Sequence, residues 1–117
     1  MVKAIRVRSR PDVIETPPTH NQVLRDIVQY LEYLGFVVVK THDERNRPAK
    51  AGTPDLIAIG RKLTLPVEVK VGEDIIRPKQ LEWARAYTER TARHVFYARS
   101  VLDVQNYLNY LGTVAWK

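Results

Sequence analysis

The chain has 117 residues, no cysteine, and 19 lysine and arginine residues against 13 aspartate and glutamate residues, which gives a net charge of +6. This length suits one domain, and a hydrophobic fraction of 44% excludes a disordered chain. Without cysteine there are no disulfides or thiolate zinc sites, so we expect a cytoplasmic protein. No apolar run approaches the roughly 20 residues that span a membrane. The basic charge favours a polyanionic partner, nucleic acid first, although basicity for solubility alone is the alternative.

The first half of the chain begins with a basic segment and continues as a helix and a strand. Residues 1–18 are predicted to form a basic arm or an edge strand, because Lys3–Arg8 alternates basic and apolar residues. Apolar residues at helical spacing predict a helix over Thr19–Leu34. Phe36–Thr41 is rich in β-branched residues and apolar enough for a central strand. The polar residues His42–Ala51 then predict a loop.

Charged residues interrupt the next two apolar segments, which we expect to form a hairpin over Arg61–Thr64. The expected register places Asp55 opposite Lys70 and Ile57 opposite Glu68, so the three charged groups share one face of the sheet. Ionised groups in buried strands are costly unless they are paired or hold a metal. The pattern therefore predicts a divalent-metal site beside a fixed cation, and a structural ion-pair cluster is the alternative.

The C-terminal third adds two helices and two short strands. Pro78 begins a helix that runs to about Thr91, with an apolar packing face. That face comprises Leu81, Trp83, Ala84 and Tyr87. His94–Ala98 is a strand, Ser100 caps a helix that ends at Gly112, and Thr113–Lys117 is a candidate terminal strand. The order predicts an α/β fold of mixed α+β type, with a mixed central sheet flanked by helices in a single domain, residues 1–117.

Phosphodiester hydrolysis would explain why carboxylates and a lysine converge. A hard divalent cation held by carboxylates can activate water and neutralise charge on the phosphoryl oxygens. Asp55 and Glu68 would supply the ligand oxygens. Lys70, a compact point charge, could hold the attacking water or a phosphate oxygen.

A longer motif surrounds these residues and resembles a known nuclease family. It consists of Gly52-Thr53-Pro54-Asp55-Leu56-Ile57, then Glu68-Val69-Lys70, then Gln80 and Trp83 on the following helix. This pattern resembles the PD-(D/E)xK nuclease signature and, within it, the VRR-NUC branch with its small stand-alone phage members. The resemblance extends from about Gln22 to Leu111.

The resemblance implies a restriction-endonuclease-like core and a DNA endonuclease that uses Mg²⁺ or Mn²⁺. Asp55, Glu68 and the Val69 backbone carbonyl would be metal ligands, and Lys70 the catalytic lysine. Gln80 would help to organise a water molecule or the scissile phosphate. Taken without the resemblance, Gln80 is an exposed residue in the first turn of a helix.

One position departs from the family pattern. Members usually carry a glutamate near the start of the first helix, where this chain has Gln22, with Asp26 one turn later. An amide is a poorer ligand for a hard metal than a carboxylate, so Gln22 is a candidate ligand, directly or through water. Asp26 could substitute for it or be a solvated charge. His20 and His42 lack zinc-ligand spacing and are not expected to bind metal.

Basic residues near the predicted site are candidate phosphate contacts that would set affinity more than sequence choice. They are Arg45, Arg47, Lys50, Arg61, Lys62, Arg77 and Lys79. A solvated basic rim is the alternative for each. Trp83 and Tyr87 are expected in the core rather than as base-stacking platforms.

The resulting functional hypothesis is a structure-specific endonuclease that acts on branched DNA as a homodimer. Two active sites related by a two-fold axis would suit a four-way (Holliday) junction. A non-catalytic DNA-binding module on the same fold, with a weakened metal site, is the alternative. A third hypothesis is a protein-interaction domain whose charged cluster is structural.

Overall fold

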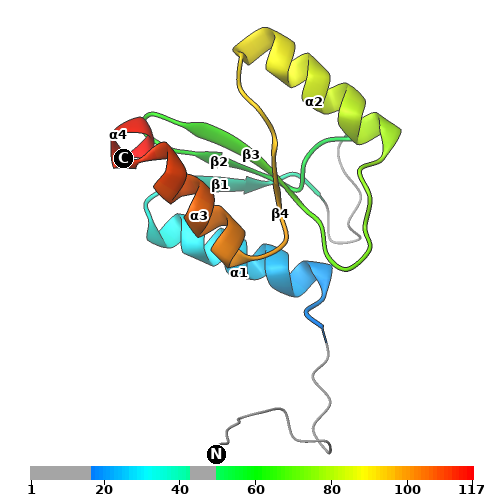
Figure 1. Cartoon of the computed structure of the whole chain (residues 1–117), viewed down its shortest axis with the longest axis horizontal. Coiled ribbons are helices and arrows are strands. Elements are labelled where there is room, and N and C mark those ends of the chain that lie inside the picture. The colour runs from blue at the N-terminus through cyan, green and yellow to red at the C-terminus, as the bar shows by residue number, and fades with distance from the viewer. Residues whose placement is uncertain (1–16, 43–49) are drawn as a thin grey trace, which may run out of the picture.

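Four strands form one mixed sheet in the computed structural model, which describes residues 17–42 and 50–117 (Figure 1). Their order across the sheet is β1 (Val37–Lys40), β2 (Leu56–Ile59), β3 (Thr64–Val69) and β4 (Phe96–Ala98). The first two pairings are antiparallel and the last is parallel. The predicted N-terminal strand and most of the loop that precedes Ala51 lie outside the described residues.

Helices α1 (His20–Tyr33) and α3 (Val101–Leu111) cover one face of this sheet (Figure 1). The core lies between them and the sheet, because alternate residues of β2 and β3 point to this side and are apolar. Its most buried members include Ile27, Leu31, Leu56, Val67, Val104 and Leu108. Within residues 17–42 and 50–117, no helix is long and apolar enough to cross a lipid bilayer.

Helix α2 (Pro78–Thr91) lies on the opposite side of the sheet and has the predicted bounds (Figure 1). Against the described part of the chain it buries none of its side chains. The expectation that Trp83 and Tyr87 belong to the core is therefore wrong, because both are only partly buried, lie outside the core cluster and stack on each other. Leu81 is 40% exposed, so the predicted packing face of α2 is only loosely covered.

The β2–β3 hairpin is tighter than predicted. The Gly60 amide donates to the Leu63 carbonyl, so only Arg61 and Lys62 form the turn. Ile57 consequently lies opposite Pro66 rather than Glu68, a shift of two residues. Because side chains alternate with a period of two, this shift leaves the charged groups on their predicted common face.

Two further expectations are corrected at the edges of the fold. The first strand is an edge strand, not a central one, in the described sheet, and Val37 is 64% exposed. Thr113–Trp116 is the short helix α4 rather than a strand. Trp116 stacks on Phe36 and its indole N–H donates to the Leu108 carbonyl, which fixes the chain end against the core.

Candidate active site

The β2–β3 hairpin brings Asp55, Glu68 and Lys70 together in a hollow of about 300 Å³ at the open end of the hairpin. They are the three buried polar or charged residues in the described chain, with exposures of 3%, 5% and 8%. They lie in or next to β2 and β3, and most residues of these two strands are buried. Burial makes their electrostatic interactions strong, since little water screens the charges.

Asp55 is held by one backbone contact and two histidines. The Val69 amide donates to Asp55 Oδ2 at 2.7 Å. His20 Nε2 lies 3.1 Å from the same oxygen, and His42 Nδ1 lies 3.5 Å from Oδ1. The hydrogen bond to Asp55 raises the pKa of His20 above its usual value.

Sequence reasoning missed both histidines as parts of the site. His20 is the first residue of α1, and His42 follows β1, where Thr41 Oγ1 contacts the His42 ring and the Pro54 carbonyl. His20 and Asp55 are 35 residues apart, so no local spacing connects them. His20 could have been suspected from its position alone, because it is a polar residue at the start of the first helix. The family pattern has a carboxylate facing the site near this position.

Glu68 has one paired and one unpaired oxygen. Its Oε2 accepts from Gln80 Nε2 at 2.7 Å and lies 3.3 Å from Lys70 Nζ. Its Oε1 is buried and has no hydrogen-bond partner among the described residues. Burial, and next the charge of Asp55, raise the pKa of Glu68 to about 7. A buried carboxylate oxygen without a partner is costly and is suited to a bound cation.

Gln80 connects Lys70, Glu68 and the start of α2. Its Oε1 accepts from Lys70 Nζ and from the Arg77 backbone amide, each at 2.8 Å. Lys70 also donates to the Ile75 carbonyl at 2.9 Å. The ammonium group therefore has three oxygen neighbours and a fixed position beside Glu68. The structure thus places Gln80 in the hollow rather than in solvent.

The structure places Gln22 at a helix cap rather than in the hollow. Its Oε1 accepts from the Thr19 amide at 2.8 Å, and Thr19 Oγ1 accepts from the Gln22 amide. This reciprocal capping box occupies the Gln22 side chain. The prediction that Gln22 is a metal ligand is therefore corrected. Asp26 is exposed and does not line the hollow.

The predicted phosphate contacts fall into three groups. Arg77 lines the hollow, while Lys50 and Lys79 line an adjacent groove. The hairpin tip lies at the other end of β2 from Asp55, so Arg61 and Lys62 do not flank the site, which corrects that prediction. Arg45 and Arg47 lie outside the described residues.

The donor set fits a hard divalent cation. Among the described residues, no group of three His, Asp or Glu side chains is arranged so that all three could bind one metal ion. Mg²⁺, however, commonly binds through only one or two carboxylates and keeps several water ligands. Asp55, Glu68 with its unpaired oxygen, and Val69 all line the hollow, and two carboxylates with a backbone carbonyl would suit such a cation.

A mixed sheet that carries this carboxylate pair and lysine on its central hairpin is the arrangement that the PD-(D/E)xK resemblance implied. No protein-family model and no curated protein matches the sequence. A solved structure described as "VRR_NUC domain" is similar, with a TM-score of 0.63 and 26% identity. The match covers 78% of this chain and 95% of that one. The chain therefore shares the fold of the VRR_NUC domain, and this likeness supports its assignment to the VRR-NUC nucleases.

Proposed function

We propose that this protein is a metal-dependent DNA endonuclease that hydrolyses phosphodiester bonds, with Mg²⁺ or Mn²⁺ as its cofactor. The observation that carries the proposal is the convergence of buried Asp55, Glu68 and Lys70 in one hollow, with Glu68 Oε1 unpaired. A purely structural ion-pair cluster would be expected to satisfy each buried oxygen. The unpaired oxygen therefore favours a site for a ligand.

Asp55, Glu68 and the Val69 carbonyl would hold the cation. When bound, it would polarise the phosphoryl group and lower the pKa of a bound water molecule. His20 and His42 orient Asp55, since both rings lie against its carboxylate. This outer layer of contacts fixes a ligand before the metal binds.

Lys70 would stabilise negative charge on the phosphate or position the attacking water. Its contacts with Gln80 and the Ile75 carbonyl hold the ammonium group beside Glu68. Gln80 acts as a positioning residue, because its amide connects Glu68 with Lys70. Arg77, at the rim of the same hollow, supplies a cation for a neighbouring phosphate.

The proposed substrate is branched DNA, and the proposed active form is a homodimer. Val37, Val39, Ile57 and Ile59 form a contiguous patch on β1 and β2, on the sheet face opposite the core. Val37 lies directly opposite Ile59, and the two are 64% and 44% exposed. A second copy that covers this patch would produce a two-fold dimer with two sites, which suits the two strands cut in a four-way junction.

A non-catalytic DNA-binding module is the second candidate. It is favoured by the existing partners of Asp55, because the Val69 amide and His20 already satisfy one of its oxygens. In such a module the cluster would bind no metal. It would still bind DNA through the basic residues, in a salt-sensitive manner.

The test is cleavage of labelled junction, flap and duplex DNA with Mg²⁺ or Mn²⁺. Asp55→Ala and Lys70→Ala are each expected to slow cleavage by roughly a hundredfold or more, because charge stabilisation is lost. Lys62→Ala, which removes a cation in the hairpin turn at the far end from Asp55, is the matched control and should cut normally. Equal activity in all four proteins would overturn the proposal.

Calorimetry with Mn²⁺ separates the two candidates. The nuclease is expected to give a binding heat that is absent in Asp55→Ala. Salt-sensitive DNA binding without that heat and without cleavage would instead identify the non-catalytic module.

A further inference from the structure

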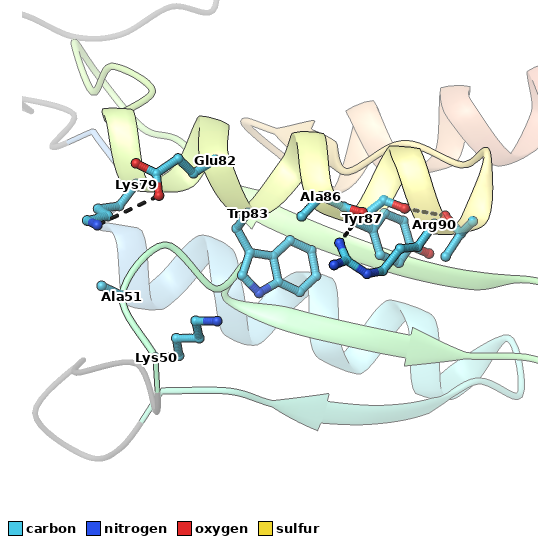
Figure 2. A pocket seen from close by; sticks show the side chains of 9 residues that line it. Lys50, Ala51, Lys79, Glu82, Trp83, Ala86, Tyr87 and Arg90 are labelled. Atoms are coloured by element: carbon cyan, nitrogen blue, oxygen red, sulfur yellow. Dashed lines mark hydrogen bonds and ion pairs between the residues drawn. The ribbon is translucent and has the colours of Figure 1, made fainter.

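A second and larger hollow, of about 450 Å³, lies beside α2 (Figure 2). It is lined on one side by Lys50 and Ala51 and on the other by one face of the helix. Trp83 and Tyr87 form its aromatic surface, with ring centroids 5.4 Å apart and an interplanar angle of 15°. We call this hollow the α2 groove. Trp83 and Tyr87, which are not part of the core, thus line the α2 groove.

The charges around the α2 groove favour an anionic occupant. Three cationic residues line it, namely Lys50, Lys79 and Arg90, against one carboxylate, Glu82. Lys79 Nζ lies 3.7 Å from Glu82 Oε1, but both side chains are about two-thirds exposed, so this ion pair is weak. Stacked aromatic rings with cations at the rim are the combination by which proteins hold unpaired nucleotides. A nucleotide uses both features at once, because its base can stack on the rings while its phosphate pairs with the cations.

The α2 groove adjoins the candidate active site. The two hollows are built from the same two segments: Ala51 and Lys79 line the groove, whereas Asp55 and Gln80 line the site. These segments touch at Gly52, where an added Cβ would lie only 2.1 Å from the Lys79 carbonyl oxygen. The two hollows are therefore neighbours across this backbone contact, and a DNA strand whose phosphate lies in the site would pass over the contact to reach the groove.

We propose that the α2 groove binds unpaired nucleobases of the DNA strand that is cut, with a base stacked on the Trp83–Tyr87 pair. This inference rests on the proposed nuclease function and adds to it a preference for unpaired nucleotides next to the scissile phosphate. In a continuous duplex the bases are stacked on each other and cannot reach the aromatic rings. Flaps and junctions, which offer unpaired or readily unstacked bases, are the better substrates.

Binding without metal tests the groove separately from catalysis. In the presence of a chelator, the affinity for a labelled oligothymidine is compared with that for an oligonucleotide of equal length whose central residues are abasic. The native protein is expected to prefer the strand with bases. Trp83→Ala should reduce this preference by about tenfold, because one stacking contact is lost, and Trp83→Phe should retain most of it. Tyr110→Ala removes an aromatic ring that is 84% exposed elsewhere on the surface and should change nothing.

Tryptophan fluorescence provides a second measurement that does not depend on affinity. Oligothymidine should quench the native emission, and Trp83→Phe should remove the quenching while it still binds the strand. Equal affinity for the two strands, or an unchanged preference in Trp83→Ala, would overturn the inference. A third result would also overturn the inference. If Trp83→Ala changes the melting temperature or the oligomeric state but keeps the preference for the strand with bases, a protein segment rather than DNA occupies the α2 groove. If Asp55→Ala abolishes cleavage in that case, the proposed nuclease function stands without the groove.

Discussion

Glu68 is a buried carboxyl group whose two oxygens have different surroundings. One of its oxygens contacts Gln80 and lies near Lys70, while the other is buried without a partner in the described chain. This half-satisfied state has a cost that depends on protonation, because only the ionised form suffers the full desolvation penalty. A bound cation and a bound proton are therefore alternative ways to stabilise the same carboxyl group.

The raised pKa of Glu68 predicts that the metal-free protein loses stability as the pH rises. In the folded chain this pKa is about 7, against 4.5 in its ordinary state, so between these values the folded chain binds more protons than the unfolded chain. The free energy of unfolding should fall from pH 4.5 to about 7, by a Glu68 contribution on the order of 3 kcal/mol, and then level off. Urea denaturation at a series of pH values in the presence of a chelator measures this decrease.

Glu68→Gln is the matched control for that measurement. It keeps the size of the side chain and removes the titration, so the native-minus-variant difference isolates Glu68 from His20, whose raised pKa also lowers stability as the pH rises. The native protein should also gain more stability from added Mg²⁺ at pH 8 than at pH 5.5, because the proton competes with the cation. A native-minus-variant difference that is independent of pH would contradict the raised pKa.

Single residues differ in how far the sequence predicts their place. Asp55, Glu68 and Lys70 could be placed on a common face because the predicted register differs from the observed one by two residues, and an even shift keeps each side chain on its face. His20 and His42 could not be placed, since their positions depend on how α1 and the end of β1 approach β2. Gln22 was predicted to face the site, but its side chain instead bonds the Thr19 backbone in the capping box of α1.

Among the elements, α2 has the weakest attachment and carries an essential part of the candidate site. It buries no side chain against the rest of the described chain, yet Gln80 in its first turn must contact both Glu68 and Lys70. The close approach of Gly52 to the Lys79 backbone fixes the start of the helix. Only glycine permits this approach, because Gly52 has a φ of +87° and no Cβ.

Gly52→Ala should therefore displace the start of α2 and impair cleavage. The added Cβ would lie 2.1 Å from the Lys79 carbonyl oxygen, so the helix must move and Gln80 should lose its contacts with Glu68 and Lys70. We expect a lower melting temperature and a cleavage rate reduced by roughly tenfold or more. Thermal denaturation and the cleavage assay measure the two effects.

Gly72→Ala is the control for backbone strain alone. Gly72 also has a positive φ, of +57°, but an added Cβ there meets no atom within 4 Å. This variant should lose about 1 kcal/mol of stability and keep its activity. If Gly52→Ala were as active as Gly72→Ala, the contact with Lys79 would not be what positions Gln80.

The elements that were predicted wrongly are those whose state is decided by distant contacts. Phe36–Thr41 has the composition of a central strand, but a strand becomes central only if another strand pairs with its second edge. Thr113–Trp116 is too short for periodicity to distinguish a strand from a helix. The stack between Trp116 and Phe36 determines its position, and neither residue predicts the other.

At the scale of the whole molecule, the sheet is covered unevenly. Helices α1 and α3 lie on one face and α2 lies on the other (Figure 1). On the α2 side, the β1–β2 patch of Val37, Val39, Ile57 and Ile59 stays partly exposed. Large apolar side chains at neighbouring positions on an antiparallel pair are unusual on a fully exposed surface. The proposed dimer would remove this patch from water.

Val39→Glu is expected to convert the proposed dimer to a monomer, because a carboxylate would then be buried without a partner between the two copies. Light scattering during size-exclusion chromatography measures the mass. Val114→Glu, at a residue that is 83% exposed outside the patch, should leave the dimer intact.

On a four-way junction the native dimer should cut two opposed strands within one encounter, whereas the Val39→Glu monomer should make single nicks and still cut flaps. A native protein that is monomeric at assay concentrations, or a Val39→Glu variant that remains dimeric, would remove the patch as the interface.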